Sequence, residues 1–309
     1  MEPAQAKGYL LEYEILRLLG DAGYIKVKKG IVRGRGANHQ IDAYGVFLFP
    51  TAFIYPIRLL SEVKFYDETI GLEVVRNFVG VLKDIQENYI VNRFHQRNLQ
   101  LRYTEAGCIF SATPFKQTAQ EYAWAHNIFL VSFNQIQMMD QLIQKINLCV
   151  QYPGIVAILN SEEKHKQKRI IDVYKKIRLD STNIEVPSLV VGILDNVYPV
   201  ILVGKKGWIN RIIPPTYSDK LDSRKDYRQD VPDFLNNSNE NRTPLVHIFH
   251  ITLQKEPIEF SIPEFAGRKI IEKIKRKKEI IAVLQIPFLD TTSGKSVRRI
   301  ISLDVKMPI

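Results

Sequence analysis

Two stretches decide the fold of this chain: His39-Gln40-Ile41-Asp42-Ala43-Tyr44-Gly45 and Leu59-Leu60-Ser61-Glu62-Val63-Lys64-Phe65. Apolar residues flank both, so we expect two buried strands joined around residues 50–56. Side chains alternate between the two faces of a strand, which puts Glu62 and Lys64 on one face. Each strand therefore carries charge into apolar surroundings.

The charged residues of these strands need a partner if they are buried, because unpaired charges are rarely found in a core. A divalent metal ion would satisfy Asp42 and Glu62, since carboxylate oxygens are hard ligands suited to Mg²⁺. Lys64 beside them could orient a water molecule or offset charge on phosphorus. The alternative is a half-exposed hairpin whose charges face solvent, and for Asp42 alone that is the simpler interpretation. The combination of all three residues favours a site.

The length and composition of the chain limit the classes of protein to which it can belong. At 309 residues the chain is long enough for two domains, and its 45% hydrophobic and 25% charged content is ordinary for a globular protein. It lacks an apolar run of about 18 residues, so we expect no transmembrane helix and no membrane partner. The N-terminal residues lack the apolar core of a signal peptide. Cys108 and Cys149 lie in apolar surroundings and have no metal-site spacing, which predicts buried free thiols in a reducing cytoplasm.

The formal net charge of +10 is unevenly distributed. Residues 1–150 carry 16 Lys/Arg and 14 Asp/Glu, so about +8 lies beyond residue 150. A basic excess attracts polyanions such as nucleic acids, although a solvated surface would have the same composition.

The first domain is predicted to span residues 1–150 as an α/β fold. Strands that alternate with helices late in this part indicate a mixed sheet flanked by helices. The expected elements, in order, are a helix (5–21), a strand (24–28), a glycine-rich loop (28–36), the hairpin (42–64), a helix (69–88), a strand (108–112), a helix (115–126), a strand (128–133) and a helix (138–150).

Basic residues in two expected loops are candidate nucleic-acid contacts. Arg33 and Arg35 lie among glycines, and Arg93 and Arg97 lie in a polar connection. The glycines do not form a dinucleotide-binding motif, because His39 stands where the third glycine would be. A flexible loop near a phosphate backbone suits the first pair, and a plain solvated loop remains an alternative for the second.

The second half is predicted to contain a basic helical linker (151–185) and a β-rich α+β domain of unknown type (186–309). The linker has a Pro/Gly-marked boundary at 151–160 and a helix at 161–179. The expected elements of the last domain are strands at 189–194, 197–203, 208–213, 245–253, 280–288 and 297–305, a helix at 265–278 and a long polar loop at 214–244.

Residues 5–135 resemble the Mrr-like branch of the PD-(D/E)XK restriction-endonuclease superfamily. Four stretches carry the likeness: Gly8–Glu12 leading to Ala22–Tyr24, Gly36–Asp42, Ser61–Phe65, and Gly107–Phe115 followed by Ala119 and Ala123. Ile41 stands in place of the superfamily's proline, and Glu62 stands where many members of the branch have glutamine. Neither departure removes a metal ligand.

The resemblance implies an α/β restriction-endonuclease-like domain that hydrolyses DNA phosphodiester bonds with Mg²⁺, for which Mn²⁺ can substitute. Asp42 and Glu62 would ligate the metal, together with the carbonyl of Val63, and Lys64 would orient water or stabilise the transition state. Glu12, on the first helix, would complete the metal shell. A solvent-facing helix carboxylate is an equal alternative for that residue.

The leading hypothesis is thus a metal-dependent endonuclease of a prokaryotic restriction or antiviral defence system. The alternatives are a repair or junction nuclease, and a non-catalytic nucleic-acid-binding or assembly module on the same fold. The expected partner is DNA, and the candidate protein partners are a second copy of the chain or a helper subunit. The expected location is the cytoplasm.

Overall fold

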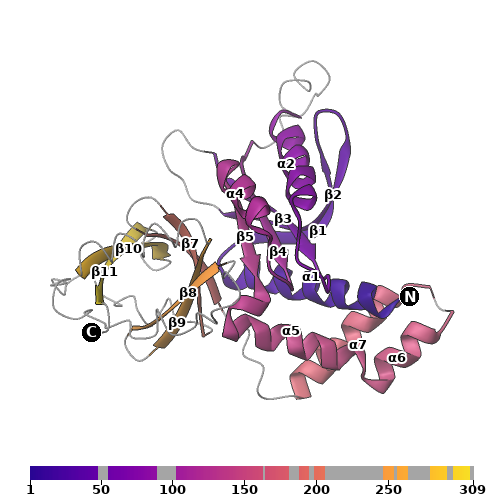
Figure 1. Cartoon of the computed structure of the whole chain (residues 1–309). Helices are drawn as coiled ribbons and strands as arrows, with labels where there is room; N and C mark the ends of the chain where they lie inside the picture. The colour runs from indigo at the N-terminus through magenta and orange to yellow at the C-terminus, as the bar shows by residue number, and fades with distance from the viewer. Residues whose placement is uncertain are drawn as a thin grey trace. The chain divides into compact units, whose positions relative to one another are not determined.

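The computed structural model describes residues 1–47, 55–88, 102–162, 164–180, 188–194, 198–205, 246–253, 256–263, 279–290 and 295–306 (Figure 1). The chain divides into two compact units. The first comprises Met1–Asn134 and Met139–Ile184, and the second comprises Gln135–Met138 and Glu185–Ile309.

The first unit is built on a mixed five-stranded sheet in which the strand order follows the chain order. The first three strands pair antiparallel, and the last three pair parallel. The strands are β1 (Ile25–Arg33), β2 (Asn38–Phe47), β3 (Ile57–Lys64), β4 (Thr104–Ser111) and β5 (Ile128–Ser132). This part confirms the predicted α/β class with a mixed sheet flanked by helices.

Both faces of the sheet are covered, as the run of buried residues along β4 from Gly107 to Ser111 shows. Residues from two helices and several strands, including Phe78, Leu60 and Ile109, form one buried apolar cluster. These helices are α2 (Leu72–Gln86) and α4 (Gln117–Ala125). A further helix, α1 (Pro3–Asp21), packs on the first three strands.

The β1–β2 hairpin is longer than expected. The residues predicted as a loop from Lys28 continue as strand up to Arg33, because they pair with the beginning of β2 as far as Asn38. Glycine and basic residues indicated a loop locally, but the pairing with β2 overrides that preference. Val32 of this extension is buried in the apolar cluster.

Helices also follow the first 150 residues. The chain continues as α5 (Gln137–Val150), α6 (Pro153–Asn160) and α7 (Lys166–Asp180). The expected boundary at 151–160 is therefore mostly helix, since proline is well tolerated in the first turn. The Tyr174 ring of α7 meets the Tyr13 ring of α1 edge-on, with centroids 6.1 Å apart. The segment expected as a linker thus contributes two helices to the first unit.

The second unit contains a six-stranded antiparallel sheet with the order β11-β10-β6-β7-β9-β8. The strands are β6 (Ser188–Leu194), β7 (Tyr198–Gly204), β8 (Val246–Leu253), β9 (Glu256–Pro263), β10 (Glu279–Asp290) and β11 (Lys295–Lys306). Strand β9 was not predicted. The predicted strand at 208–213, loop at 214–244 and helix at 265–278 lie outside the described residues.

Within the described residues, no single helix has the length and apolar character needed to cross a membrane, although α5 and α6 pass that test as a pair bent by 62°.

Two glycine substitutions should change stability in opposite directions. A Cβ at Gly107 would lie 2.7–3.0 Å from the side chains of Ile128, Leu82 and Phe78, so Gly107→Ala should cost about 1–3 kcal/mol. Gly80 is exposed within α2 and has open space around it, so Gly80→Ala should add about 0.5–1 kcal/mol through its higher helix propensity. Urea unfolding of the full chain would measure both, and equal effects would contradict the described packing.

Candidate functional site

The structure brings together Asp42 in the middle of β2 and Glu62 near the end of β3. The last pair of this antiparallel ladder is Ala43 with Ser61, and one further step along the same register puts Asp42 opposite Glu62. Asp42 Oδ2 accepts a hydrogen bond of 2.9 Å from the backbone N–H of Val63. The aspartate carboxylate is thereby tied to the segment that carries Glu62 and Lys64.

An irregularity in β2 accompanies this arrangement. The β1–β2 register shifts between the pairs Lys28–Tyr44 and Gly30–Ile41, which bracket Asp42. Gly30 has φ 151°, a backbone conformation that is open essentially only to glycine. Bulges of this kind re-aim side chains and recur next to functional sites. The irregularity therefore explains how a strand residue can direct its carboxylate to the neighbouring backbone.

The Asp42 carboxyl group has an unfavourable electrostatic environment. Burial is the main cause that raises its pKa to about 6, and the negative charges of Glu62 and Glu12 raise it further. The Val63 N–H and the Lys64 ammonium act in the opposite direction but do not compensate fully. Burial, assisted by the neighbouring carboxylates, therefore disfavours the ionised form of Asp42.

Lys64 forms an ion pair with Glu62, with Nζ 2.6 Å from Oε1. Burial acts to lower the pKa of Lys64, but the Glu62 hydrogen bond and the nearby negative charges outweigh it, so the pKa is raised. Lys64 is consequently a cation at neutral pH. It can stabilise negative charge and orient a water molecule.

Glu12 contacts Lys29 of β1, with 3.1 Å between Oε2 and Nζ, and its side chain is only 16% exposed. It is therefore not the fully solvated helix carboxylate that was one of the two alternatives. Its charge acts on Asp42, which places it within electrostatic reach of the site. A role in metal binding remains a prediction.

The oxygen donors of this site suit a hard divalent cation. Asp42 and Glu62 supply carboxylates. In a strand the N–H and C=O of one residue point to the same side, so the Val63 carbonyl faces the side on which its N–H meets Asp42. A bound cation would also favour the ionised form of Asp42, which burial and the neighbouring carboxylates disfavour. Among the described residues, no group of three or more His, Cys, Asp or Glu side chains is arranged to hold a metal.

The structure describes two of the four candidate arginines, Arg33 and Arg35. Arg33 is exposed at the end of β1, and its carbonyl accepts a hydrogen bond of 3.0 Å from Asn88 Nδ2. Arg35 forms an exposed ion pair of 3.2 Å with Glu87. Such surface pairs contribute little to stability, so Arg35 could exchange Glu87 for a phosphate. Arg93 and Arg97 lie outside the described residues.

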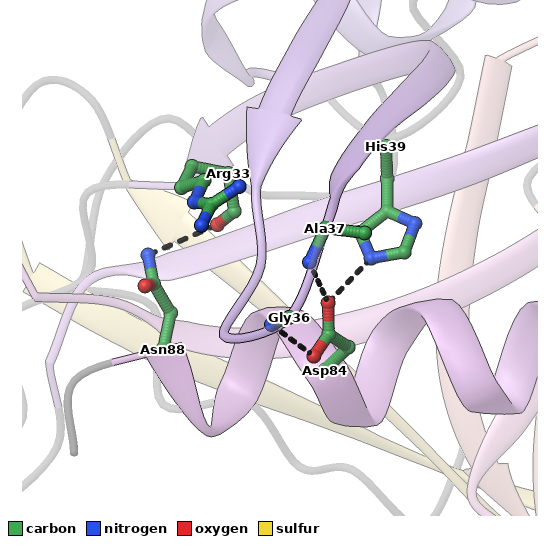
Figure 2. Close-up of polar contacts among 6 residues, drawn as sticks. All are labelled: Arg33, Gly36, Ala37, His39, Asp84 and Asn88. Carbon is green, nitrogen blue, oxygen red and sulfur yellow. Dashed lines mark hydrogen bonds and ion pairs between the residues drawn. The ribbon is translucent and has the colours of Figure 1, made fainter. Parts of the chain in front are cut away.

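Asp84 of α2, which the sequence did not single out, braces the turn between β1 and β2 (Figure 2). Its carboxylate accepts hydrogen bonds from Gly36 N at 2.8 Å and Ala37 N at 3.2 Å, and it lies 2.6 Å from His39 Nε2. These contacts lower the Asp84 pKa, with His39 as the largest cause. A Cβ at Gly34 would overlap this carboxylate.

The turn therefore differs from the flexible loop expected from its glycines. Its glycines allow close approach to Asp84, and the backbone N–H of Arg35 also binds the Asp84 carbonyl at 2.8 Å. The brace holds the strand three residues before Asp42. The sequence carries no local signal for it, because the partners are 45–48 residues apart.

Comparison with known proteins identifies no family for the chain. No protein-family model matches the chain, and no curated protein matches it. One solved structure, the crystal structure of a protein of unknown function called AF1548, is 18% identical with a TM-score of 0.32. The match covers 55% of this chain and 98% of that one. At these values the similarity carries no argument.

Because burial and the neighbouring carboxylates disfavour ionised Asp42, we expect Asp42→Asn to stabilise the metal-free protein at pH 7.5 by about 1–3 kcal/mol. The folded-state pKa of about 6 exceeds the unfolded value of about 4, so the folded state binds this proton more tightly. The contribution of this proton to the free energy of unfolding is complete below about pH 4 and is lost as the pH rises through about 6. Asparagine removes the charge and can still accept the Val63 hydrogen bond.

Urea unfolding at pH 4 and pH 7.5 with a chelator present would measure this difference between variant and wild type. It should shrink towards zero at pH 4. Asp172→Asn, at an exposed residue of α7, is the matched control and should change little at either pH. An Asp42→Asn variant no more stable than wild type at pH 7.5 would contradict the assigned electrostatics.

Proposed function

We propose that this chain is a metal-dependent nuclease that hydrolyses phosphodiester bonds of DNA, and that it serves in a prokaryotic restriction or antiviral defence system. The observation that carries the proposal is the convergence of Asp42, Glu62 and Lys64 at the point where the pairing of β2 with β3 ends. Two carboxylates and one ammonium group at such a point suit phosphoryl chemistry, which depends on positioning and charge stabilisation.

The proposed roles follow from the local chemistry. Asp42, Glu62 and the Val63 carbonyl would hold Mg²⁺, or Mn²⁺ in its place. When bound, the metal would supply Lewis-acid polarisation of the phosphate and a more acidic water ligand. Lys64, which stays protonated, would neutralise charge that develops on the phosphate oxygens. Its ion pair with Glu62 keeps the ammonium at the site in the absence of substrate.

The charge of the whole chain supports a polyanionic substrate. The net charge is +10, and the edge strand β1 exposes Lys26, Lys28 and Arg33. A carboxylate site would repel DNA by itself, so surrounding cations are needed for the substrate to approach. The restriction or defence setting rests on the resemblance of residues 5–135 alone.

We expect Asp42→Ala, Glu62→Ala and Lys64→Ala each to reduce Mg²⁺-dependent cleavage of plasmid DNA by at least about 100-fold, since each removes a charge from the reacting centre. Asp172→Asn, far along the chain on α7, should retain the wild-type rate. Circular dichroism and gel shift would establish that the variants fold and still bind DNA. Full cleavage by Glu62→Ala would contradict the assignment of these residues as the catalytic site. DNA binding without cleavage by the wild type would favour a non-catalytic module.

Glu12→Gln should have a smaller effect than Glu62→Ala. If Glu12 assists the metal, the variant should need several-fold more Mg²⁺ for half-maximal cleavage, because water can replace one of several oxygen ligands. Asp172→Asn, at an exposed carboxylate of α7, is the matched control and should leave the Mg²⁺ midpoint unchanged. A Mg²⁺ titration of Glu12→Gln with unchanged midpoint and maximum rate would limit Glu12 to its contact with Lys29.

A further inference from the structure

Aromatic rings accompany the lysines around the candidate site. Lys64 Nζ lies 5.9 Å from the centre of the Tyr66 ring. Two further pairs have the same character, namely Lys7 over Phe65 at 5.5 Å and Lys29 over Tyr9 at 5.5 Å. These six residues are here called the basic aromatic rim.

The rim belongs to the same part of the structure as the carboxylates. Phe65 and Tyr66 directly follow Lys64 at the end of β3. Lys7 and Tyr9 lie on α1, the helix that also carries Glu12, and Lys29 is the direct partner of Glu12. Three elements therefore place ring and ammonium pairs next to the groups proposed to act on phosphate.

Tyr66 has ring surface left for a ligand. Tyr66 is 48% exposed, so part of its ring is open to solvent. Its neighbour Lys64 is held by Glu62 and does not require the ring as its partner. An exposed ring beside a cation offers two different contacts at once, a flat apolar face and a positive charge.

These two contacts match the two parts of an unpaired nucleotide. A base can stack on an aromatic face, while its phosphate is attracted to a lysine a few ångströms away. In an intact duplex the bases are stacked on each other, so a ring at the surface cannot reach their faces. Alternating rings and cations are therefore suited to a single strand rather than to a continuous double helix.

We propose that the basic aromatic rim binds an unpaired DNA strand, with a base stacked on Tyr66, and that the preferred substrate of the site is single-stranded DNA or an unpaired segment. This inference rests on the proposed nuclease function and narrows its substrate. The cations of the rim bring the sugar–phosphate chain to the carboxylates, and Tyr66 fixes its register relative to Lys64.

Binding of a fluorescent single-stranded oligonucleotide and of the matched duplex to the full chain tests this inference by anisotropy, with a chelator present to prevent cleavage. Wild type should bind the single strand at least about ten-fold more tightly than the duplex. Tyr66→Leu should raise the single-strand Kd about ten-fold, a typical effect of losing one stacked base. Tyr66→Phe keeps the ring and should stay within about twofold of wild type.

Tyr55 provides a matched control. It is 49% exposed, and the Arg102 guanidinium lies 5.9 Å from its ring centre, yet it precedes β3 while Tyr66 follows it. Tyr55→Leu should therefore leave the single-strand Kd within about twofold of wild type. A Tyr55→Leu effect as large as that of Tyr66→Leu would show that any exposed ring suffices and would overturn the assignment.

Equal affinity for single strand and duplex, or a Tyr66→Leu variant that binds both as wild type does, would also overturn the inference. Metal-dependent cleavage of duplex DNA by the wild type would then leave the nuclease proposal intact. In contrast, a Tyr66-dependent preference for the single strand without cleavage of either DNA in Mg²⁺ or Mn²⁺ would overturn the nuclease proposal and retain the strand-binding surface. The two failures are thus distinguishable.

Discussion

The hydrogen bond from the Val63 N–H to Asp42 Oδ2 is the interaction on which the candidate site depends. It forms just beyond Ala43–Ser61, the last pair of the β2–β3 ladder. A backbone donor at the end of a ladder would otherwise need water or another side chain. Asp42 supplies the acceptor and is held in one orientation as a result. The same bond joins the two strands that carry all the proposed catalytic charges.

Two aspartates of the first unit have opposite electrostatic environments. Asp84 receives two backbone hydrogen bonds and the His39 ring, which lower its pKa. Asp42 is largely buried, lies near two other carboxylates and receives one backbone hydrogen bond, and its pKa is raised to about 6, with burial as the main cause. Carboxylates with a raised pKa and several acidic neighbours are typical of sites that await a cation or a proton. The charge of Asp84 is already stabilised by hydrogen-bond donors of the protein itself.

Much of the first unit and the central part of the site could be predicted from the sequence, because both depend on short-range periodicity. Alternation along the strand put Glu62 and Lys64 on one face, and an antiparallel hairpin brings Asp42 to them. The extension of β1 to Arg33 could not be predicted, since Gly30 and its basic neighbours resemble a loop until they are paired. The Asp84 brace was missed for a related reason: a helix carboxylate bound to a distant turn has no local pattern.

The position of β1 at the edge of its sheet affects the tendency of the chain to associate with other copies of itself. An edge strand exposes unpaired backbone groups that can template pairing with another molecule. Here β1 has two register shifts, with Lys26 at φ 53° in the first and Gly30 in the second, and it exposes Lys26 and Lys28. An irregular, lysine-bearing edge is poorly matched to any second strand. The features that shape the hairpin therefore also protect it from intermolecular sheet growth.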